Sequence, residues 1–242
     1  MDNRPFTYVT FHRVRFSSPV SAHTKISGPK RALHWVFGTD SKQAADGLRT
    51  RVSDVWGGAA FYGNLSEARE AFANVSTELP FDHEVVEAWH ALICPISHKG
   101  ETNWFGSLDR ASYFVPSKSD PGGPLLVLTS AGYNALSGEE LRADLPRRID
   151  FITNVDRVLG FYAMQPGSVM RAVFQPAPVG TDGLTFSLWS DDAAMMAAAY
   201  RPGFHRTQLD RYKAERTADR SSFTRARILS CAGTWDGAAI GR

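Results

Sequence analysis

The sequence has little of what would assign it at once to a common protein class. It contains two cysteines in 242 residues, Cys94 and Cys231, too few for the disulfide framework of a secreted domain. Its formal net charge is +2, so no overall charge directs it to nucleic acid or to an anionic membrane. It has no run approaching the roughly 18 apolar residues of a membrane span.

Several motifs and signals are also missing. The sequence has no Walker A motif, no GxGxxG after a strand, no GxSxG, no HExxH and no CxxCH. The opening residues MDNRPFTYVTFHRVRF lack the apolar stretch of a secretory signal peptide. Residues 201–227 carry eight Lys or Arg against three Asp or Glu, but without the interleaved aromatic residues of a nucleic-acid stacking surface. We therefore expect a cytoplasmic protein without nucleic-acid partners or membrane spans.

The composition is that of a globular protein. Hydrophobic residues make up 43% of the chain and charged residues 21%, which excludes long disordered regions. A chain of this length forms one large domain or two small ones with a proper core.

Two segments resemble each other in pattern. AFYGNLSEAREAFA (60–73) and LTFSLWSDDAAMMAA (184–198) each begin with a short apolar strand, followed by a serine and acidic residues. Ser66 and Ser190 are therefore expected to cap helices, with the acidic residues in the first turn favoured by the helix dipole. The two serines are 124 positions apart.

Two further pairs of segments repeat in the same order. ALICPISHKGETNWFG (91–106) and ARILSCAGTWDG (226–237) both place Trp-x-Gly after an apolar strand, and FTYVTFHRVRF (6–16) and PLLVLTSAGYN (124–134) both read as opening strands. The repetition indicates an internal duplication in which each half is strand, helix, strand, strand, helix, strand. The predicted fold is α+β, with two fused ferredoxin-like repeats forming a dimeric α/β-barrel-like core.

The boundary between the halves is expected in YFVPSKSDPGGPL (113–125), which has the composition of a linker. This places a first half at 1–115, a linker at 116–122 and a second half at 123–242.

Several blocks resemble the spheroidene monooxygenase family. They are GLTFSLWSDDAAMMAAAYRPGFHR (183–206), FTRARILSCAGTWDG (223–237), AAFYGNLSEAREAF (59–72), EAWHALICPISHKGETNWFG (87–106) and NVDRVLGFYAMQPGSVMRAVFQPAPVG (154–180). The similarity extends over about residues 55–237, and TFSLW with the downstream histidine is its most specific part. The first fifty residues depart from the family, which argues against inheriting its carotenoid substrate.

The resemblance implies haem-dependent oxygen chemistry on a dimeric α/β-barrel fold. The expected activity is that of a haem b-dependent monooxygenase that acts on a small or medium organic substrate in another biosynthetic pathway. The haem would be bound non-covalently, the oxidant would be O2 or peroxide, and a homodimer is one assembly that the sequence leaves open.

His205 is the expected iron ligand. In a helix after the Pro-Gly break at 202–203, His205, Leu209 and Tyr212 share one face with Arg216, and that face should point inward. A neutral imidazole binds haem iron through one nitrogen while an acceptor orients the other. The same pattern also suits a half-buried histidine bonded to the backbone.

Other candidates follow from their position. Ser187 alternates with apolar neighbours in TFSLW, so it is a candidate catalytic donor to iron-bound oxygen or substrate, and Trp189 on the same face is a candidate wall of the cofactor site. Haem propionates need cationic partners, for which the candidates are Arg171 (also a candidate catalytic residue), Arg206, Arg225 and Arg227. Each arginine equally suits a solvent-exposed position.

Two other functions fit the same pattern. A haem-dependent dehydratase or rearrangement at nitrogen, as in aldoxime dehydratases, would use a distal acid and depend little on oxygen. A non-catalytic ligand-binding module would have the fold without haem.

Overall fold

The computed structural model describes residues 8–21, 23–24, 26–40, 45–47, 52–75, 81–104, 114–177 and 182–240. The first half contains β1 (Tyr8–Ser21), β2 (His34–Asp40), β3 (Val52–Tyr62), α1 (Leu65–Ala73) and β4 (Val85–Gly100). The second half contains β5 (Leu125–Gly132), α3 (Gly138–Ala163), β6 (Ser168–Ala177), β7 (Gly183–Trp189), α4 (Asp192–Tyr200), α5 (Phe204–Glu215) and β8 (Arg220–Trp235), and β9 (Ala238–Ala239) ends the chain.

The strands form one antiparallel barrel built from two equivalent halves. The order in the first half is β4-β1-β3-β2, and that in the second is β8-β5-β7-β6, so each half has the strand order of a ferredoxin-like unit. β2 pairs with β6, and β4 pairs with β8 over most of its length, which closes the barrel. The predicted α+β fold of two fused ferredoxin-like halves is therefore confirmed.

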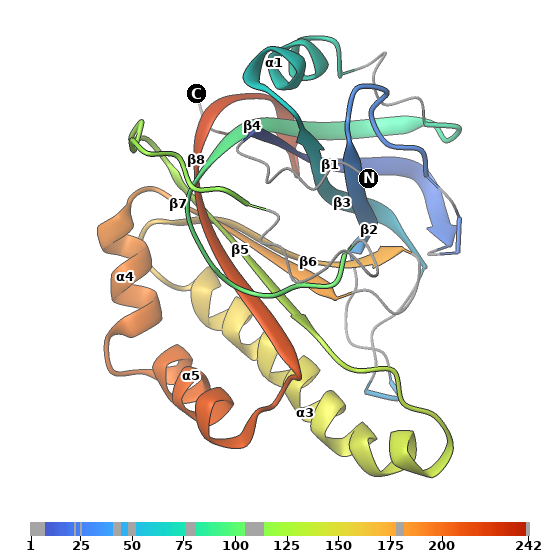
Figure 1. Cartoon of the computed structure of the whole chain (residues 1–242), viewed down its shortest axis with the longest axis vertical. Helices are drawn as coiled ribbons and strands as arrows, with labels where there is room; N and C mark the ends of the chain where they lie inside the picture. Colours follow the sequence, from blue (N-terminus) through green and yellow to red (C-terminus); the bar gives the residue numbers. More distant parts are fainter. Residues whose placement is uncertain are drawn as a thin grey trace.

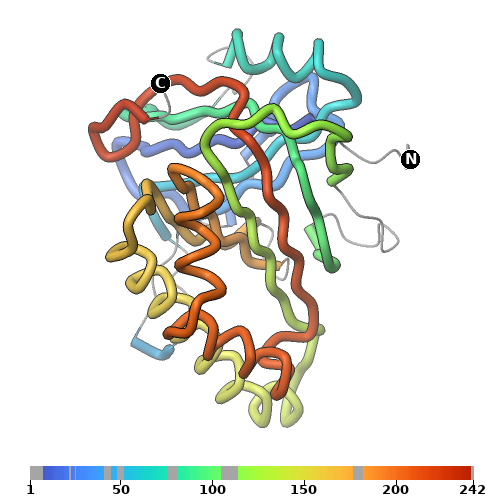
Figure 2. The backbone as a smooth tube through the Cα atoms, turned by 90° about the vertical axis from the view of Figure 1, so that its left-hand side faces the viewer, coloured from blue at the N-terminus to red at the C-terminus, as the bar shows by residue number. Residues whose placement is uncertain are grey.

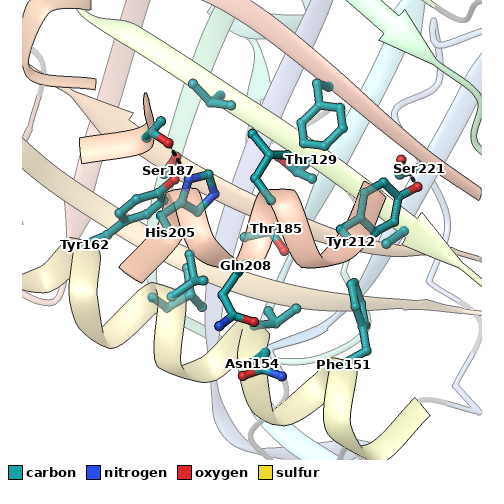
Figure 3. Close-up of a pocket in the computed structure, with 18 of the residues that line it drawn as sticks. Thr129, Phe151, Asn154, Tyr162, Thr185, Ser187, His205, Gln208, Tyr212 and Ser221 are labelled. Carbon is teal, nitrogen blue, oxygen red and sulfur yellow. Dashed lines mark hydrogen bonds between the residues drawn. The ribbon is translucent and has the colours of Figure 1, made fainter. Parts of the chain in front are cut away.

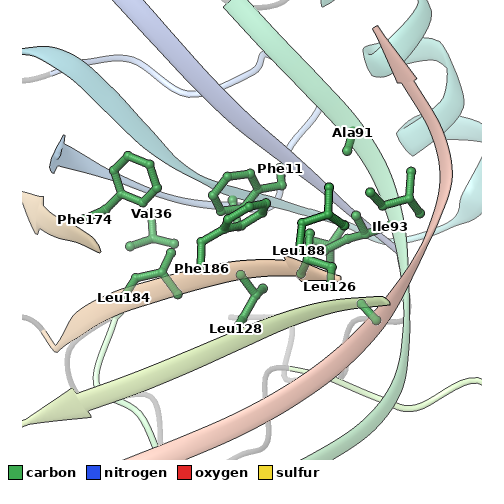
Figure 4. Close-up of a cluster of buried hydrophobic side chains, with 14 of the residues drawn as sticks. Phe11, Val36, Ala91, Ile93, Leu126, Leu128, Phe174, Leu184, Phe186 and Leu188 are labelled. Atoms are coloured by element: carbon green, nitrogen blue, oxygen red, sulfur yellow. The ribbon is translucent and has the colours of Figure 1, made fainter. Parts of the chain in front are cut away.

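The barrel interior is the main hydrophobic core. Side chains from both halves point toward one another there, among them Phe11, Val36, Ile93, Leu128, Phe174 and Phe186 (Figure 4). Phe11 stacks on Phe186 at a centroid distance of 4.6 Å, which joins β1 of one half to β7 of the other. Because strand residues alternate between faces, every second residue of these strands lies on the outer face instead.

Helices cover the outer faces unequally. α3, α4 and α5 lie together over the outer face of the second half, whereas α1 lies at the opposite end of the molecule (Figures 1 and 2). The helix predicted between the first two strands of the first half is absent from the described residues 23–24 and 26–33. Pro29 and Gly28 fall within this short connection, and Ile26 and Ala32 pack against the sheet where a helix would lie.

The helix caps differ from the prediction in both halves. α1 begins after Asn64, whose side chain accepts from the backbone N–H of Glu67, and α4 begins after Asp191, whose side chain accepts from Ala194. Ser66 lies inside α1, and Ser190 donates to the Asp191 carboxylate. The structural repeat therefore aligns residues 64 and 191, 127 positions apart, because Asn and Asp cap a helix as well as Ser does.

The predicted linker at 116–122 lies between β4 and β5, and the structure assigns it no helix or strand. Among the described helices, none combines the length and the hydropathy that crossing a lipid bilayer requires.

Candidate active site

A cavity of about 200 Å³ lies between the outer face of the second half and its three helices. Its floor is formed by β5, β7 and β8, and its walls by α3, α4 and α5. Most of the lining is apolar, with Val127, Phe151, Val155, Val158, Leu159 and Leu209. Tyr200 and Phe223 also line it and are exposed, so the cavity reaches the protein surface on that side.

The sheet register decides which strand residues face the cavity. Ser187 on β7 pairs with Val127 on β5, which in turn pairs with Arg225 on β8, and all three line the cavity. Thr185 and Trp189 share this face, whereas Phe186 and Leu188 point into the barrel core. The alternation of TFSLW thus gives β7 one face for the barrel and one for the cavity.

His205 lies in the first turn of α5 and lines one end of the cavity, close to Tyr162 and Ser187 (Figure 3). Leu209 and Tyr212 line the cavity from the same helix face. Arg216, predicted to share this face, is the left-handed C-cap (φ 49°) and does not line the cavity.

The His205 ring is held by its neighbours in a defined orientation. Its Nδ1 is 2.8 Å from the carbonyl oxygen of Ala199, so Nδ1 carries the proton and donates it there. The ring of Tyr162 lies 5.2 Å from that of His205. Burial lowers the pKa of His205, while the bond to Ala199 opposes this, so the ring is neutral at pH 7 and its Nε2 keeps a lone pair.

Ser187 lies beside His205, and Trp189 contacts Ser187. The indole Nε1 of Trp189 donates to Ser187 Oγ at 3.0 Å, which leaves the hydroxyl proton of Ser187 available for another acceptor. Trp189 is fully buried and packs edge-on against Tyr162 at 4.9 Å. Ser187 is therefore a hydrogen-bond donor in the wall of the cavity, and Trp189 is part of the packing behind it.

Arg225 is the one candidate arginine that lines the cavity. Its guanidinium lies 3.4 Å from Met196 Sδ and 3.4 Å from the Tyr200 hydroxyl, and 6.0 Å from the Tyr200 ring centroid. Within the described part of the chain it forms no ion pair. A cation without a carboxylate partner at the opening of an apolar cavity is available for an anionic group of a ligand.

The structure places the other three arginines outside the cavity. Arg227 binds the carboxylates of Asp120 and Asp192, at 2.7 and 2.6 Å, and the carbonyl of Gly123. Arg206 is exposed and pairs with Asp210. Arg171 lies opposite Ser187 on β6, on the same face of the sheet, but beyond the cavity lining.

Sequence reasoning missed the contribution of α3. Tyr162, Asn154 and Phe151 line the cavity from this helix, and Gln208 does so from α5. Residues 151, 154, 155, 158, 159 and 162 recur at helical spacing, so an inward-facing Asn154 among apolar neighbours was a readable signal.

No family model matches the chain, and neither does any curated protein sequence. Among solved structures, an aldoxime dehydratase in complex with butyraldoxime is similar over 95% of this chain and 81% of its own, with 9% identity and a TM-score of 0.49. An anthrone oxidase-like protein covers 99% of this chain and 98% of its own, with 10% identity and a TM-score of 0.35. SnoaB from Streptomyces nogalater, a cofactor-independent oxygenase, matches 49% of this chain and 97% of its own, with 18% identity and a TM-score of 0.30. At these values the likenesses do not bear on cofactor or substrate.

Proposed function

We propose that the cavity of the second half is the active site of a haem b-dependent monooxygenase that acts on a small or medium organic substrate. The observation that carries this proposal is His205: its Nδ1 is bound to the Ala199 carbonyl, which directs a neutral ring with a free Nε2 into an apolar cavity. A histidine ligand of haem iron requires this combination of neutral ring, orienting acceptor and open nitrogen.

The residues present suit a non-covalent haem. His205 would supply a nitrogen ligand to the iron, Arg225 would pair with a propionate at the opening, and the apolar side chains of α3 would contact the haem. Bound haem would supply oxygen activation, with O2 and a reductant or with peroxide as oxidant. Ser187 would donate its hydroxyl proton to an oxygen atom of the bound reactants, and the apolar walls would exclude water.

The size of the cavity sets a requirement on this proposal. Its volume of about 200 Å³ is smaller than the roughly 300–1,000 Å³ of pockets that enclose drug-sized ligands. Haem binding therefore requires the cavity to widen. α5 has no fully buried residue, so it is the wall that the rest of the protein fixes least.

The first test is an absorption spectrum of the protein reconstituted with haem. We expect a Soret band in the wild type that is lost or shifted in His205→Ala, while His98→Ala, a half-buried histidine bonded to Thr224 outside the cavity, keeps the wild-type spectrum. A folded wild-type protein without a Soret band would contradict the proposal.

The small volume favours a second candidate in that case, a binding module that encloses a small organic ligand without haem. A Soret band accompanied by turnover that does not depend on oxygen or peroxide would instead indicate the dehydratase chemistry.

A further inference from the structure

The middle of the cavity contains four neutral polar side chains from four different elements. They are Thr129 of β5, Thr185 of β7, Asn154 of α3 and Gln208 of α5. Figure 3 shows them between His205 at one end of the cavity and Tyr212 at the other. The sheet register places the two threonines side by side, because Thr129 and Thr185 are directly paired.

These side chains have unused hydrogen-bonding capacity. Asn154 is 9% exposed, and its Nδ2 donates to the carbonyl of Asp150, which fixes its Oδ1 as the free atom of the amide. Within the described residues, Asn154 Oδ1 has no hydrogen-bond partner, and neither has the amide of Gln208 nor the hydroxyl of either threonine. Asn154 is buried and the other three side chains are half-buried, so a ligand that displaces water from them must replace its hydrogen bonds or lose affinity.

Nearby residues at the Tyr212 end of the cavity already satisfy one another. The hydroxyl of Tyr212 lies 2.6 Å from Ser221 Oγ, and Arg211 binds the carboxylate of Asp150 at 2.8 Å. The guanidinium of Arg225 lies at the opening, beside the exposed Tyr200. Apart from Ser187 and His205 at the other end, the described cavity groups with unused hydrogen-bonding capacity in its middle are therefore these four neutral ones, and apolar side chains surround them.

We propose that this cavity selects an uncharged, largely apolar ligand that carries a hydroxyl or carbonyl oxygen, bound by Asn154, Gln208, Thr129 and Thr185. The proposal deepens the proposed function by naming the substrate class of the same site, and it does not require haem. An oxygen-bearing ligand satisfies the free amides and hydroxyls, whereas its hydrocarbon analogue leaves them buried and unpaired. A carboxylate among these four side chains would exchange its hydration for neutral partners alone, because the unpaired guanidinium of Arg225 lies at the opening of the cavity.

The test measures binding of four matched probes to the protein purified without added haem, by tryptophan fluorescence or calorimetry. They are 1-naphthol, 1-tetralone, naphthalene and 1-naphthoate. We expect 1-naphthol and 1-tetralone to bind about tenfold or more tightly than naphthalene, and 1-naphthoate to bind more weakly than either. Equal affinities, preference for the anion, or no binding of any probe would overturn the proposal.

Substitutions then assign the preference to the four side chains. Asn154→Leu and Gln208→Leu should each reduce the preference for 1-naphthol over naphthalene several-fold, and Thr185→Val should do so less. Thr207→Val on the exposed side of α5 is the matched control and should leave it unchanged, because the Thr207 hydroxyl donates to the Gly203 carbonyl of its own helix and does not line the cavity. Gln208→Leu at a half-buried position keeps the test valid if Asn154→Leu fails to fold. An unchanged preference in a folded Gln208→Leu variant would contradict the role given to this amide.

This experiment separates the two proposals. A missing Soret band with a clear preference for 1-naphthol would overturn the haem proposal and leave the ligand class standing, and the reverse pattern would overturn the ligand class alone.

Discussion

The outer faces of the two halves are formed by sheets with the same strand order, but they differ in how closely side chains fill the space over them. In the second half a cavity separates the sheet from α3, α4 and α5. In the first half the same face is packed with side chains around His12 and His90, both buried. Their Nδ1 atoms are 2.8 Å apart, and His12 Nε2 lies 2.6 Å from Thr10, whose hydroxyl is 3.0 Å from that of Tyr62.

The register makes the comparison specific. His12 pairs with Gly58 and His90, and the corresponding positions of the second half are Thr129, paired with Thr185 and Phe223. Gly58 and Thr185 each lie six residues before a helix cap, which confirms their equivalence. The imidazole rings of His12 and His90 in the first half thus occupy the positions of Thr129 and the exposed Phe223 in the second. A few side chains, together with the absence of a helix from the described residues between β1 and β2, therefore decide whether the space over the sheet is filled or hollow.

The largest expected effect on stability comes from adding a methyl group at Gly58, which is equivalent to Thr185 in the second half. A Cβ on Gly58 would lie within van der Waals overlap of the Val36 carbonyl oxygen and the Phe37 Cα, both backbone atoms that cannot yield. Gly58→Ala should lower the free energy of unfolding by about 3 kcal/mol or more, or prevent folding. Thr185→Ala, which only removes a methyl and a hydroxyl from a cavity wall, should cost less than about 1 kcal/mol. Chemical denaturation measures the change in free energy of unfolding for both variants. Similar values would show that the two positions are packed alike.

The next effect concerns acid stability. Burial lowers the pKa of His90 to about 4, and burial together with the charge of His90 lowers that of His12 well below 6.5. The unfolded chain therefore binds more protons than the native protein between pH 6.5 and 4, so stability falls as the pH drops through this window. The contribution of His90 alone amounts to about 3 kcal/mol.

The double variant His12→Gln and His90→Gln should lose most of this pH dependence, as measured by unfolding at pH 7 and pH 4.5. His205→Gln should remove less of it, because the bond from His205 to Ala199 favours the protonated ring. Glu87 contributes little to this window: burial raises its pKa, but hydrogen bonds from Gly237 and Arg13 outweigh this and hold it at about 2, so the stability it provides is lost mainly below pH 4.5. A double variant with the wild-type pH profile would refute the assignment to the first half.

The smallest change in stability is expected from filling the cavity. Thr185→Phe introduces a ring into the open space, so the second half would resemble the first. We expect the free energy of unfolding to change by about 1 kcal/mol or less, while the affinities for haem and for 1-naphthol fall at least tenfold. Retained binding of both would show that the ligands bind elsewhere.

The sequence made the repeat visible because strand patterns and helix starts are local. TFSLW and the downstream helix predicted the strand face that holds Ser187 and Trp189 and the helix face that holds His205. The missing helix before β2 was not foreseen, since the repeat was read as uniform although residues 22–33 contain Gly28 and Pro29.

The local sequence pattern did not predict that Arg227 forms ion pairs with two carboxylates. Its partner Asp120 lies 107 residues away in the connection between the halves, and Asp192 belongs to α4, so only the folded chain brings them together. Arg225, two residues earlier on the same face of the strand, meets no carboxylate and lines the cavity. Sequence identified both arginines as inward candidates, and long-range packing alone separates them.

The pairing of β4 with β8 has a consequence for how this architecture evolves. Each of the eight barrel strands in the described chain has a neighbour on both sides, and two of these contacts, β2 with β6 and β4 with β8, join different halves. A half on its own would expose two sheet edges and invite aggregation, so selection acts on the pair as one cooperative unit. In the fused chain, one half can keep a closely packed outer face that stabilises the fold, and the other half can keep a cavity for a ligand.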